Sequence, residues 1–160
     1  MLNLKSFENT HKSALNLINK YHENQRDKGN NSYKEHLFYV ADKCKNTDAK
    51  ITALLHDILE DTSCTEEVLM ENQIPLEVIA AIKLLTKPQE LTYNEYIDLI
   101  IKSNNRIALE VKFWDLNHNM NLTRLNNLAE RDVNRVNKRY KPAQDKIYNK
   151  LLEMENSPIL

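Results

Sequence analysis

Four ionisable side chains interrupt an otherwise apolar segment of the chain, residues 53–62, which reads ALLHDILEDT. His56 and Glu60 are four residues apart, so on a helix they would share one face. The same spacing separates Asp57 from Asp61, and Asp57 also falls on the apolar stripe that is expected to face the core. Because a buried carboxylate without a partner is costly, the segment predicts a positive partner, and a bound divalent metal is the simplest one.

Two further ionisable residues lie on apolar stripes elsewhere in the chain. Asp115 continues the helical stripe of residues 107–114, and His36 stands beside Leu37 on another predicted helix. Three helices would therefore each direct imidazole or carboxylate groups to the interior. The candidate ligands offer two neutral nitrogens and two anionic oxygens: His36, His56, Asp57 and Asp115. This mixed set suits Mn²⁺, Fe²⁺, Co²⁺ or Zn²⁺ better than Ca²⁺, which prefers oxygen ligands.

An ordinary explanation competes with each of these assignments. A single histidine on a helix is more often a hydrogen-bonded core or surface residue than a metal ligand. We expect this ordinary role for His11, His22 and His118, although His118 could also support a ligand. Asp61 could cap the next helix and Glu60 could be solvated. By contrast, the two aspartates on apolar stripes are hard to explain without a partner.

The elements that would position these residues are helices. Helical periodicity runs along nearly the whole chain, and no segment alternates with the period of two that is typical of strands. Asp48 is predicted to cap the helix that carries residues 53–62, and a capping box at residues 63–66 to open a short helix after it. The other predicted elements are a first helix to about Tyr21, a polar loop over residues 23–31, and helices over residues 36–44, 75–85, 92–101, 103–114 and 142–154.

This pattern predicts an all-α fold of roughly eight to ten helices. Residues 1–160 are expected to form a single domain, with its core at about residues 7–125 and a C-terminal helical extension at about residues 126–160.

The composition is that of a globular domain, with 41% hydrophobic and 28% charged residues. A net charge of −1 disfavours nucleic acid as the main partner, and no apolar run has the length of a membrane span or the form of a signal peptide. We therefore expect a cytoplasmic protein without a nucleic-acid or membrane partner. The single glycine, Gly29, excludes a glycine-rich phosphate loop, and Cys44 and Cys64 are expected to be free thiols.

The order of His36, the His56-Asp57 doublet and Asp115 on a helical background resembles the HD-domain metal-dependent phosphohydrolases. The segment ALLHDILEDT is similar, nearly residue for residue, to the signature of the hydrolase domain of RelA/SpoT-type enzymes, which act on guanosine tetraphosphate (ppGpp). The other segments that carry this likeness are residues 21–26, 33–41, 84–87 and 111–120, so that it covers about residues 10–125.

The resemblance implies an HD-domain multi-helix bundle that hydrolyses a nucleotide, releasing pyrophosphate from the ribose 3′ position of ppGpp. It implies one bound divalent metal, usually Mn²⁺, on His36, His56, Asp57 and Asp115. It implies that Glu60 and Asp61 position or deprotonate the attacking water. The positions that match or lie near the family's nucleotide contacts are Asn119 and the basic residues Arg26 and Lys28.

The chain departs from the family near the expected substrate-recognition region. Leu116 follows the last aspartate where the family commonly has arginine, and Asn121 and Leu122 replace an Arg-Thr pair. Metal-dependent hydrolysis is therefore better supported than ppGpp as the particular substrate. Two alternatives stay open: an HD phosphohydrolase acting on a nucleoside monophosphate or a dNTP, and a non-catalytic nucleotide-binding HD module. The oligomeric state is not indicated by the sequence.

Basic residues recur beyond the last candidate ligand, at Arg124, Arg131, Arg135, Lys138, Arg139 and Lys141. Because acidic residues are interspersed among them, most of this set is expected to form a solvated helix face. One or two of the arginines could instead bind substrate phosphates as bidentate donors. Arg124 is the first choice because it is nearest in sequence to the helix that carries Asp115.

Overall fold

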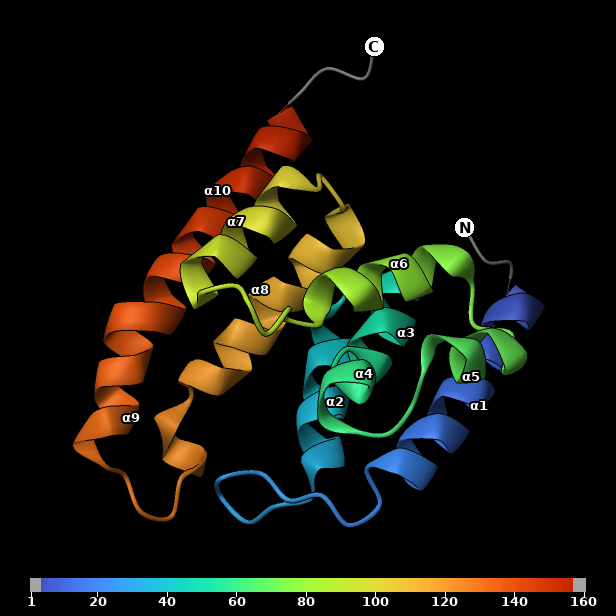
Figure 1. Ribbon diagram of the computed structural model, residues 1–160, viewed down its shortest axis with the longest axis horizontal. Helices are drawn as coiled ribbons and strands as arrows, with labels where there is room; N and C mark the ends of the chain where they lie inside the picture. The colour runs from blue at the N-terminus through green and yellow to red at the C-terminus, as the bar shows by residue number, and fades with distance from the viewer. Residues whose placement is uncertain (1–3, 157–160) are drawn as a thin grey trace.

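The structure is a computed structural model that describes residues 4–156, and within this range it is helical with no β-strand (Figure 1). The helices are α1 (Leu4–Tyr21), α2 (Tyr33–Lys43), α3 (Thr47–Leu55), α4 (Ile58–Asp61), α5 (Glu66–Glu71), α6 (Leu76–Leu85), α7 (Tyr93–Lys102), α8 (Arg106–Met120), α9 (Glu130–Arg135) and α10 (Lys141–Asn156). A 3-10 turn, η1 (Leu122–Arg124), and a π-helical segment, η2 (Val136–Tyr140), complete the order. The all-α fold expected from the periodicity is confirmed.

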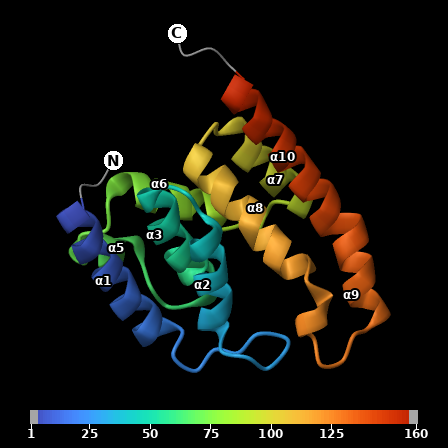
Figure 2. The same cartoon turned by 180° about the vertical axis from the view of Figure 1, so that it is seen from behind.

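Two clusters of buried apolar side chains hold these helices together. One joins α1 to α3, α5 and α6, and includes Ile18, Ile51 and Leu54. The other joins α7, α8 and α10 to α2, and includes Ile97 and Val111. In Figures 1 and 2, α10 lies beside α7 and α8 on one side of the molecule, and α1 lies on the other. Burying apolar surface in both clusters fixes α2, α3 and α8 relative to one another, and these helices carry the candidate ligands.

Helix α3 is central because it contributes to both clusters. Ala49 and Ala53 belong to the cluster with α8, whereas Ile51 and Leu54 belong to the cluster with α1. A helix that is apolar around most of its circumference is expected to be buried, and α3 satisfies this expectation. Its N-cap is Asn46, whose side chain accepts a hydrogen bond from the Ala49 N–H at 2.7 Å. The prediction that Asp48 caps this helix is therefore wrong, since the asparagine two residues earlier occupies the cap.

The largest local departure from the predicted elements lies in the segment of residues 53–62. Helix α3 ends at Leu55, His56 and Asp57 form a turn, and α4 begins at Ile58. Asp57 has φ −101° and ψ 0°, the bridge conformation rather than the helical one. Neighbouring residues of a continuous helix point about 100° apart. The break instead lets His56 and Asp57 face the same point, so the idea that residues 53–62 form one helix is wrong.

Other helix ends follow the sequence more closely. Thr92 and Glu95 form the predicted capping box at the start of α7, with the Thr92 N–H donating to Glu95 Oε2 at 2.8 Å. The box predicted at residues 63–66 does not form, because Thr65 is the N-cap of α5 and its side chain makes no capping hydrogen bond. Asn105 caps α8 by accepting from the Ala108 N–H at 2.9 Å.

The chain beyond Asn119 is more helical than the weak periodicity predicted. Segments η1, α9 and η2 follow one another before α10 begins at Lys141. Helix α10 buries Ala143 and Ile147 against α7 and α8, so the C-terminal region contributes to the second core cluster. Together these segments form the orange and red side of Figure 1.

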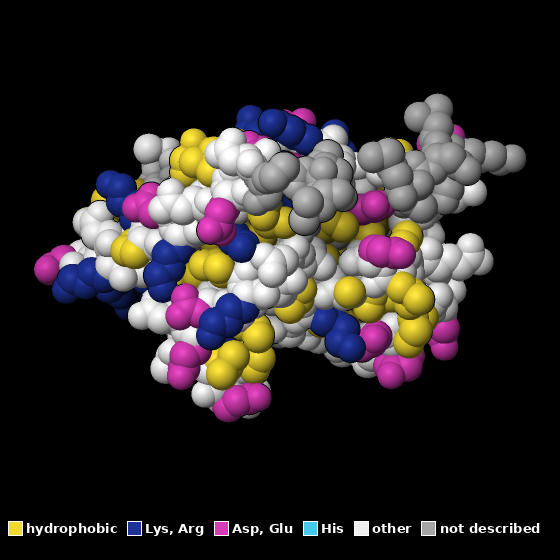
Figure 3. Space-filling view, turned by 90° about the horizontal axis from the view of Figure 1, so that it is seen from above, with side chains coloured by type: hydrophobic (Ala, Val, Ile, Leu, Met, Phe, Trp, Pro, Cys, Tyr) yellow, Lys and Arg dark blue, Asp and Glu magenta, His cyan; other side chains and the backbone are white. Residues whose placement is uncertain are grey.

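The surface is mixed in charge. In Figure 3, basic and acidic side chains alternate with hydrophobic ones on the face that is drawn, in keeping with a net charge of −1. Within residues 4–156, no helix combines the length and the apolar character that crossing a membrane would require.

Candidate metal centre and active site

The four candidate ligands converge from three parts of the fold. His36 lies on α2, His56 and Asp57 form the turn after α3, and Asp115 lies on α8. His56 Nε2 is 3.0 Å from Asp57 Oδ2, and His36 Nε2 is 3.3 Å from Asp115 Oδ1. The two Nε2 atoms are themselves 3.3 Å apart. We refer to these four residues as the donor cluster.

The donor cluster has the chemistry of a divalent-metal site. Donor atoms of His36, His56 and Asp115 all lie within 4.8 Å of one another, and these residues are only 3%, 2% and 5% exposed. The Nδ1–H of His56 donates to the Ala53 carbonyl at 2.7 Å, so a neutral His56 presents its Nε2 lone pair to the cluster. Nitrogen lone pairs and carboxylate oxygens brought this close in a buried site are well suited to bind a cation between them. The residues present therefore fit a divalent metal.

Electrostatics within the cluster favour negative carboxylates. Burial raises the pKa of Asp57, but the neighbouring His56 outweighs burial and lowers the pKa to about 2. Burial also opposes ionisation of Asp115, yet Lys112 and the two histidines hold its pKa well below the usual value. Burial lowers the pKa of His56, but Asp57 and Asp115 hold it well above the ordinary value. All three shifts come from the close pairing of carboxylates with histidine and lysine side chains, because each partner stabilises the charged form of the other.

Each donor is oriented by a further contact. The Tyr33 hydroxyl donates to Asp57 Oδ2 at 2.5 Å, and burial together with Asp57 raises the pKa of Tyr33, which keeps the hydroxyl protonated. Lys112 Nζ donates to Asp115 Oδ2 at 2.8 Å, and Asn119 Nδ2 donates to Asp115 Oδ1 at 2.5 Å. Partners of this kind hold ligating side chains in the required orientation.

His118 supports His36 in the same way. The Nδ1 atoms of the two rings are 2.7 Å apart, and the hydrogen bond leaves Nε2 of His36 facing the other donors. Burial and the neighbouring His36 lower the pKa of His118 to about 4, which keeps its imidazole neutral. His118 was expected to be an ordinary core or surface histidine, with support of a ligand as the alternative. Its contact with His36 agrees with the alternative.

Glu60 and Asp61, the candidate catalytic carboxylates, are exposed at the edge of the donor cluster. Both line a cavity of about 230 Å³ together with Asp57 and Asp115, which we call the carboxylate cavity. Glu60 Oε2 accepts a hydrogen bond from the Lys87 backbone N–H at 2.9 Å. Two carboxylates therefore face the same space as the two candidate aspartate ligands, in reach of a molecule bound there.

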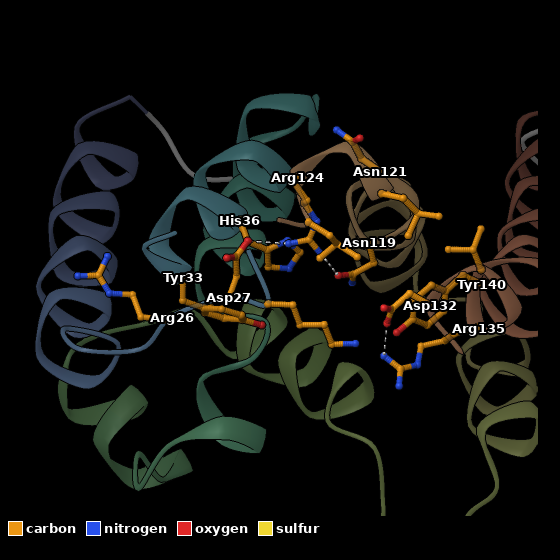
Figure 4. Close-up of a pocket in the computed structure, with 14 residues that line it drawn as sticks. Arg26, Asp27, Tyr33, His36, Asn119, Asn121, Arg124, Asp132, Arg135 and Tyr140 are labelled. Atoms are coloured by element: carbon orange, nitrogen blue, oxygen red, sulfur yellow. Dashed lines mark hydrogen bonds and ion pairs between the residues drawn. The ribbon is translucent and has the colours of Figure 1, made fainter. Parts of the chain in front are cut away.

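A second cavity, of about 220 Å³, adjoins the first and shares Tyr33, Asn119 and Tyr140 with it. We call it the basic cavity because its lining includes Arg26, Lys28, Arg124 and Arg135. Figure 4 shows Arg26 and Asp27 on one side of this space and Arg135 and Tyr140 on the other, with Arg124 and Asn119 between them. All four residues predicted to contact substrate, Arg26, Lys28, Asn119 and Arg124, therefore line one cavity.

These four residues differ in how they are held. Arg124 donates from Nη1 to Asp27 Oδ2 at 2.8 Å and from Nη2 to Asn119 Oδ1 at 3.0 Å, and its Nε is buried without a hydrogen-bond partner. Arg26 and Lys28 are exposed, and in Figure 4 the Arg26 side chain extends away from Arg124 and Asn119. Arg124 is thus a fixed component of the wall, whereas Arg26 and Lys28 belong to its exposed edge.

Several residues of the site were not singled out from the sequence as parts of it. Tyr33 and Lys112 each lie three residues before a candidate ligand on the same helix, so helical spacing carries a signal for both. Arg135 and Arg139 were included only in the basic set that was expected to be mostly solvated. Arg135 lines the basic cavity, and the exposed Arg139 lines the carboxylate cavity with its guanidinium 3.8 Å from the centre of the Tyr93 ring.

We compared the sequence and the structure with those of known proteins. The sequence matches no protein-family model and no curated protein. A solved structure of a metazoan SpoT orthologue, a protein described as hydrolysing ppGpp and acting in starvation responses, matches with a TM-score of 0.62 and 20% sequence identity. The match covers 91% of this chain and 93% of the other. The resemblance found in the sequence therefore extends to the fold, and this chain has the all-α HD-domain fold of a SpoT orthologue.

Proposed function

We propose that this protein is a metal-dependent phosphohydrolase whose substrate is ppGpp. Water would attack the 3′-diphosphate, and the products would be GDP and pyrophosphate. The observation that carries the proposal is the convergence of two buried histidines and two aspartates beside a pair of exposed carboxylates. The solved structure with the same fold is that of a ppGpp hydrolase, which supports this substrate class.

The proposed ligands of the metal are His36, His56, Asp57 and Asp115, and the proposed metal is Mn²⁺. When bound, a divalent ion supplies Lewis acidity, which lowers the pKa of a water molecule and offsets phosphoryl charge. The two aspartates balance the charge of one such ion. Their contacts with Tyr33, Lys112 and Asn119 keep the carboxylates aimed at one point.

Glu60 and Asp61 are the proposed catalytic carboxylates. Each is exposed and lines the carboxylate cavity, so each can accept a hydrogen bond from a water molecule beside the donor cluster. A carboxylate at this place can orient the water and accept its proton as the oxygen attacks phosphorus. Glu60 is held by the Lys87 N–H through only one of its oxygens, which leaves the other for this role.

The proposed substrate-binding residues are Arg26, Lys28, Asn119 and Arg124. All four line the basic cavity, which adjoins the carboxylate cavity at Tyr33, Asn119 and Tyr140. A nucleotide with phosphates on two ribose positions carries strong negative charge, which arginine and lysine side chains are suited to bind. The adjoining cavities would allow one phosphate group to reach the donor cluster while the rest of the nucleotide occupies the basic cavity.

A second candidate function is hydrolysis of another nucleotide, such as a nucleoside monophosphate or a dNTP. The specific observation in its favour is Asn121, which lines the basic cavity where the resembled family commonly has arginine. Losing one cationic donor there would weaken recognition of a highly charged nucleotide. A nucleotide-binding module without catalysis is disfavoured, because Glu60 and Asp61 are both retained.

A hydrolysis assay separates these candidates. The protein would be loaded with Mn²⁺ and given ppGpp, dNTPs and nucleoside monophosphates in parallel, and the products resolved by anion exchange. We expect GDP and pyrophosphate from ppGpp, with no turnover after chelation and strongly reduced turnover in Glu60→Gln. Turnover of another nucleotide alone would show that the substrate is that nucleotide and not ppGpp. Metal binding without turnover of any nucleotide tested would contradict hydrolysis of these substrates.

A further inference from the structure

A buried histidine outside the donor cluster contacts the site indirectly. His22 follows the last residue of α1 and is 0% exposed. Its backbone N–H donates to the Ile18 carbonyl at 2.9 Å, which continues the helix and fixes the ring at this depth. Its Nδ1 lies 2.5 Å from Gln25 Oε1, and its Nε2 is buried without a hydrogen-bond partner. The contact with Gln25 is therefore the polar contact that determines which ring nitrogen carries hydrogen.

Gln25 connects this histidine to a candidate catalytic residue. Its Nε2 donates to Asp61 Oδ2 at 2.9 Å, across 36 residues of sequence. A carboxylate oxygen only accepts, so the amide nitrogen must face Asp61 and the amide oxygen must face His22. His22 is then the donor through Nδ1–H, and its Nε2 is the bare nitrogen. One chain of hydrogen bonds thus runs from His22 through Gln25 to Asp61.

Asp61 depends on this chain in a way that Glu60 does not. Glu60 is anchored by a backbone N–H, that of Lys87, so its position is set by the main chain. The Asp61 side chain is exposed and is held by a glutamine side chain, which could itself rotate. His22 limits that freedom, because its buried ring holds Gln25 Oε1 at 2.5 Å from Nδ1 and so anchors the far side of the amide.

We propose, on the basis of the function proposed above, that His22 and Gln25 are positioning residues for Asp61. The Nδ1–H of His22 anchors the amide oxygen of Gln25, and the amide N–H of Gln25 holds Asp61 Oδ2. Oδ1 of Asp61 remains available to water in the carboxylate cavity. Neither His22 nor Gln25 lines that cavity, so both act through Asp61 and not on the substrate.

The first test measures turnover in variants that break the chain at each link. Gln25→Leu and His22→Leu should each lower kcat by about 10- to 100-fold, the usual cost of misorienting a reacting group. KM and Mn²⁺ affinity should stay unchanged, since the basic cavity and donor cluster are intact. His22→Asn should restore most of the rate, because an asparagine Nδ2 can donate from near the position of the histidine Nδ1. Glu23→Leu, at an exposed neighbour in the same loop, is the matched control.

A double-variant comparison separates positioning from general stability. In an Asp61→Ala background, Gln25→Leu should have no further effect on kcat, since the group that it positions is gone. A merely structural role would instead lower the melting temperature and reduce the residual rate in both backgrounds. That result, or wild-type turnover in Gln25→Leu, would overturn the proposal while leaving the proposed function intact.

A readout that needs no turnover completes the test. Nitrogen-15 NMR at pH 8 should find His22 with its hydrogen on Nδ1 in the wild-type protein. Gln25→Leu should shift this tautomer balance toward Nε2, and Asp61→Ala should shift the side-chain amide resonances of Gln25. If no nucleotide is hydrolysed, these spectra still decide whether the chain exists. Hydrogen on Nε2 of His22 in the wild-type protein would overturn the inference.

Discussion

The donor cluster and the basic cavity touch at His36 and Asn119, yet they are built in different ways. Three of the four donor-cluster residues are 2–5% exposed and lie where α2, α3 and α8 pack against one another. The basic cavity draws its charged residues from the loop around residues 26–28, from η1 and from the segment of α9 and η2. Among residues 122–140, Asp132 is the only buried residue, and it is 8% exposed.

This contrast separates the proposed chemistry from the proposed recognition. Donors on packed helices keep a fixed geometry, as metal binding requires. Charged residues on loops and short helical segments can vary without disturbing a core, which suits the choice between substrates. The two regions are joined at Asn119, which donates to Asp115 on one side and accepts from Arg124 on the other. Changes in the two regions should therefore have different kinetic signatures.

The largest effect is expected from removing a donor. Asp115→Asn should abolish hydrolysis and weaken Mn²⁺ binding by more than about 100-fold, beyond the cost typical of losing a residue that only supports a ligand. Titration calorimetry on the folded variant would measure the metal affinity. Because Asp115 also pairs with the buried Lys112, His56→Gln serves as a second variant that leaves this ion pair intact. Asp98→Asn, in a surface ion pair, is the control, and metal binding retained in both variants would remove the donor cluster from its role.

A carboxylate beside the cluster should affect turnover without affecting the metal. Glu60→Gln is expected to lower kcat by about 10²- to 10⁴-fold, the range for loss of a general base. Mn²⁺ affinity should stay at the wild-type value, because Glu60 lies outside the cluster of donor atoms. Steady-state kinetics with ppGpp and a parallel metal titration would measure both, and Glu90→Gln in an exposed loop is the control. Unchanged kcat would exclude Glu60 as the base.

The basic cavity should respond through KM. Arg135→Ala removes a guanidinium from its wall and should raise KM for ppGpp about 10-fold, in the range expected for one charge-assisted hydrogen bond. We expect kcat and Mn²⁺ affinity to change little, since Arg135 contacts none of the donors. Arg131→Ala, at an exposed position on the same helix outside the cavity lining, is the control. If Arg135→Ala and Arg131→Ala have the same KM, Arg135 is part of the solvated helix face and does not bind substrate.

The contact between the loop and η1 offers a smaller test. A β-carbon on Gly29 would collide with the Arg124 carbonyl oxygen, so Gly29→Ala should force the loop and η1 apart. We expect a loss of about 1–3 kcal/mol in the free energy of unfolding, typical of overpacking, and a higher KM with unchanged Mn²⁺ affinity. Asn30→Gly is the control, because Asn30 has φ 63° and glycine adopts that conformation without strain. Wild-type stability in Gly29→Ala would mean that the loop is free to move.

The smallest effect is expected at the core thiol. Burial raises the pKa of Cys44 to about 12, and the side chain is 3% exposed at the end of α2. The thiolate fraction at pH 8 should therefore be negligible, and Cys44 should not react with a thiol reagent in the folded protein. Mass spectrometry after labelling, with and without denaturant, would detect this. Rapid labelling in native conditions would indicate that the packing around α2 opens more readily than its burial suggests.

The fold class and the candidate donors could be predicted from the sequence because both depend on local order. Helical periodicity reports which face of each helix is apolar, and Asp115 stood out by lying on such a face. His56 and Asp57 were identified because they directly follow the apolar residues 53–55. In each case the signal lies within one helix or one turn, where spacing along the chain determines position in space.

The break between α3 and α4, the supporting contacts and the cavities were decided only by the tertiary structure. Gln25 meets Asp61 across 36 residues, and Asp27 meets Arg124 across 97. Periodicity identifies the face of a helix but not the residue that it meets, so such pairs carry no local signal. The conformation of Asp57 likewise serves distant contacts, because it aims the side chain at Tyr33 and His36 on α2. The residue types of the site could therefore be identified from the sequence, whereas their geometry was determined by the packing of distant segments.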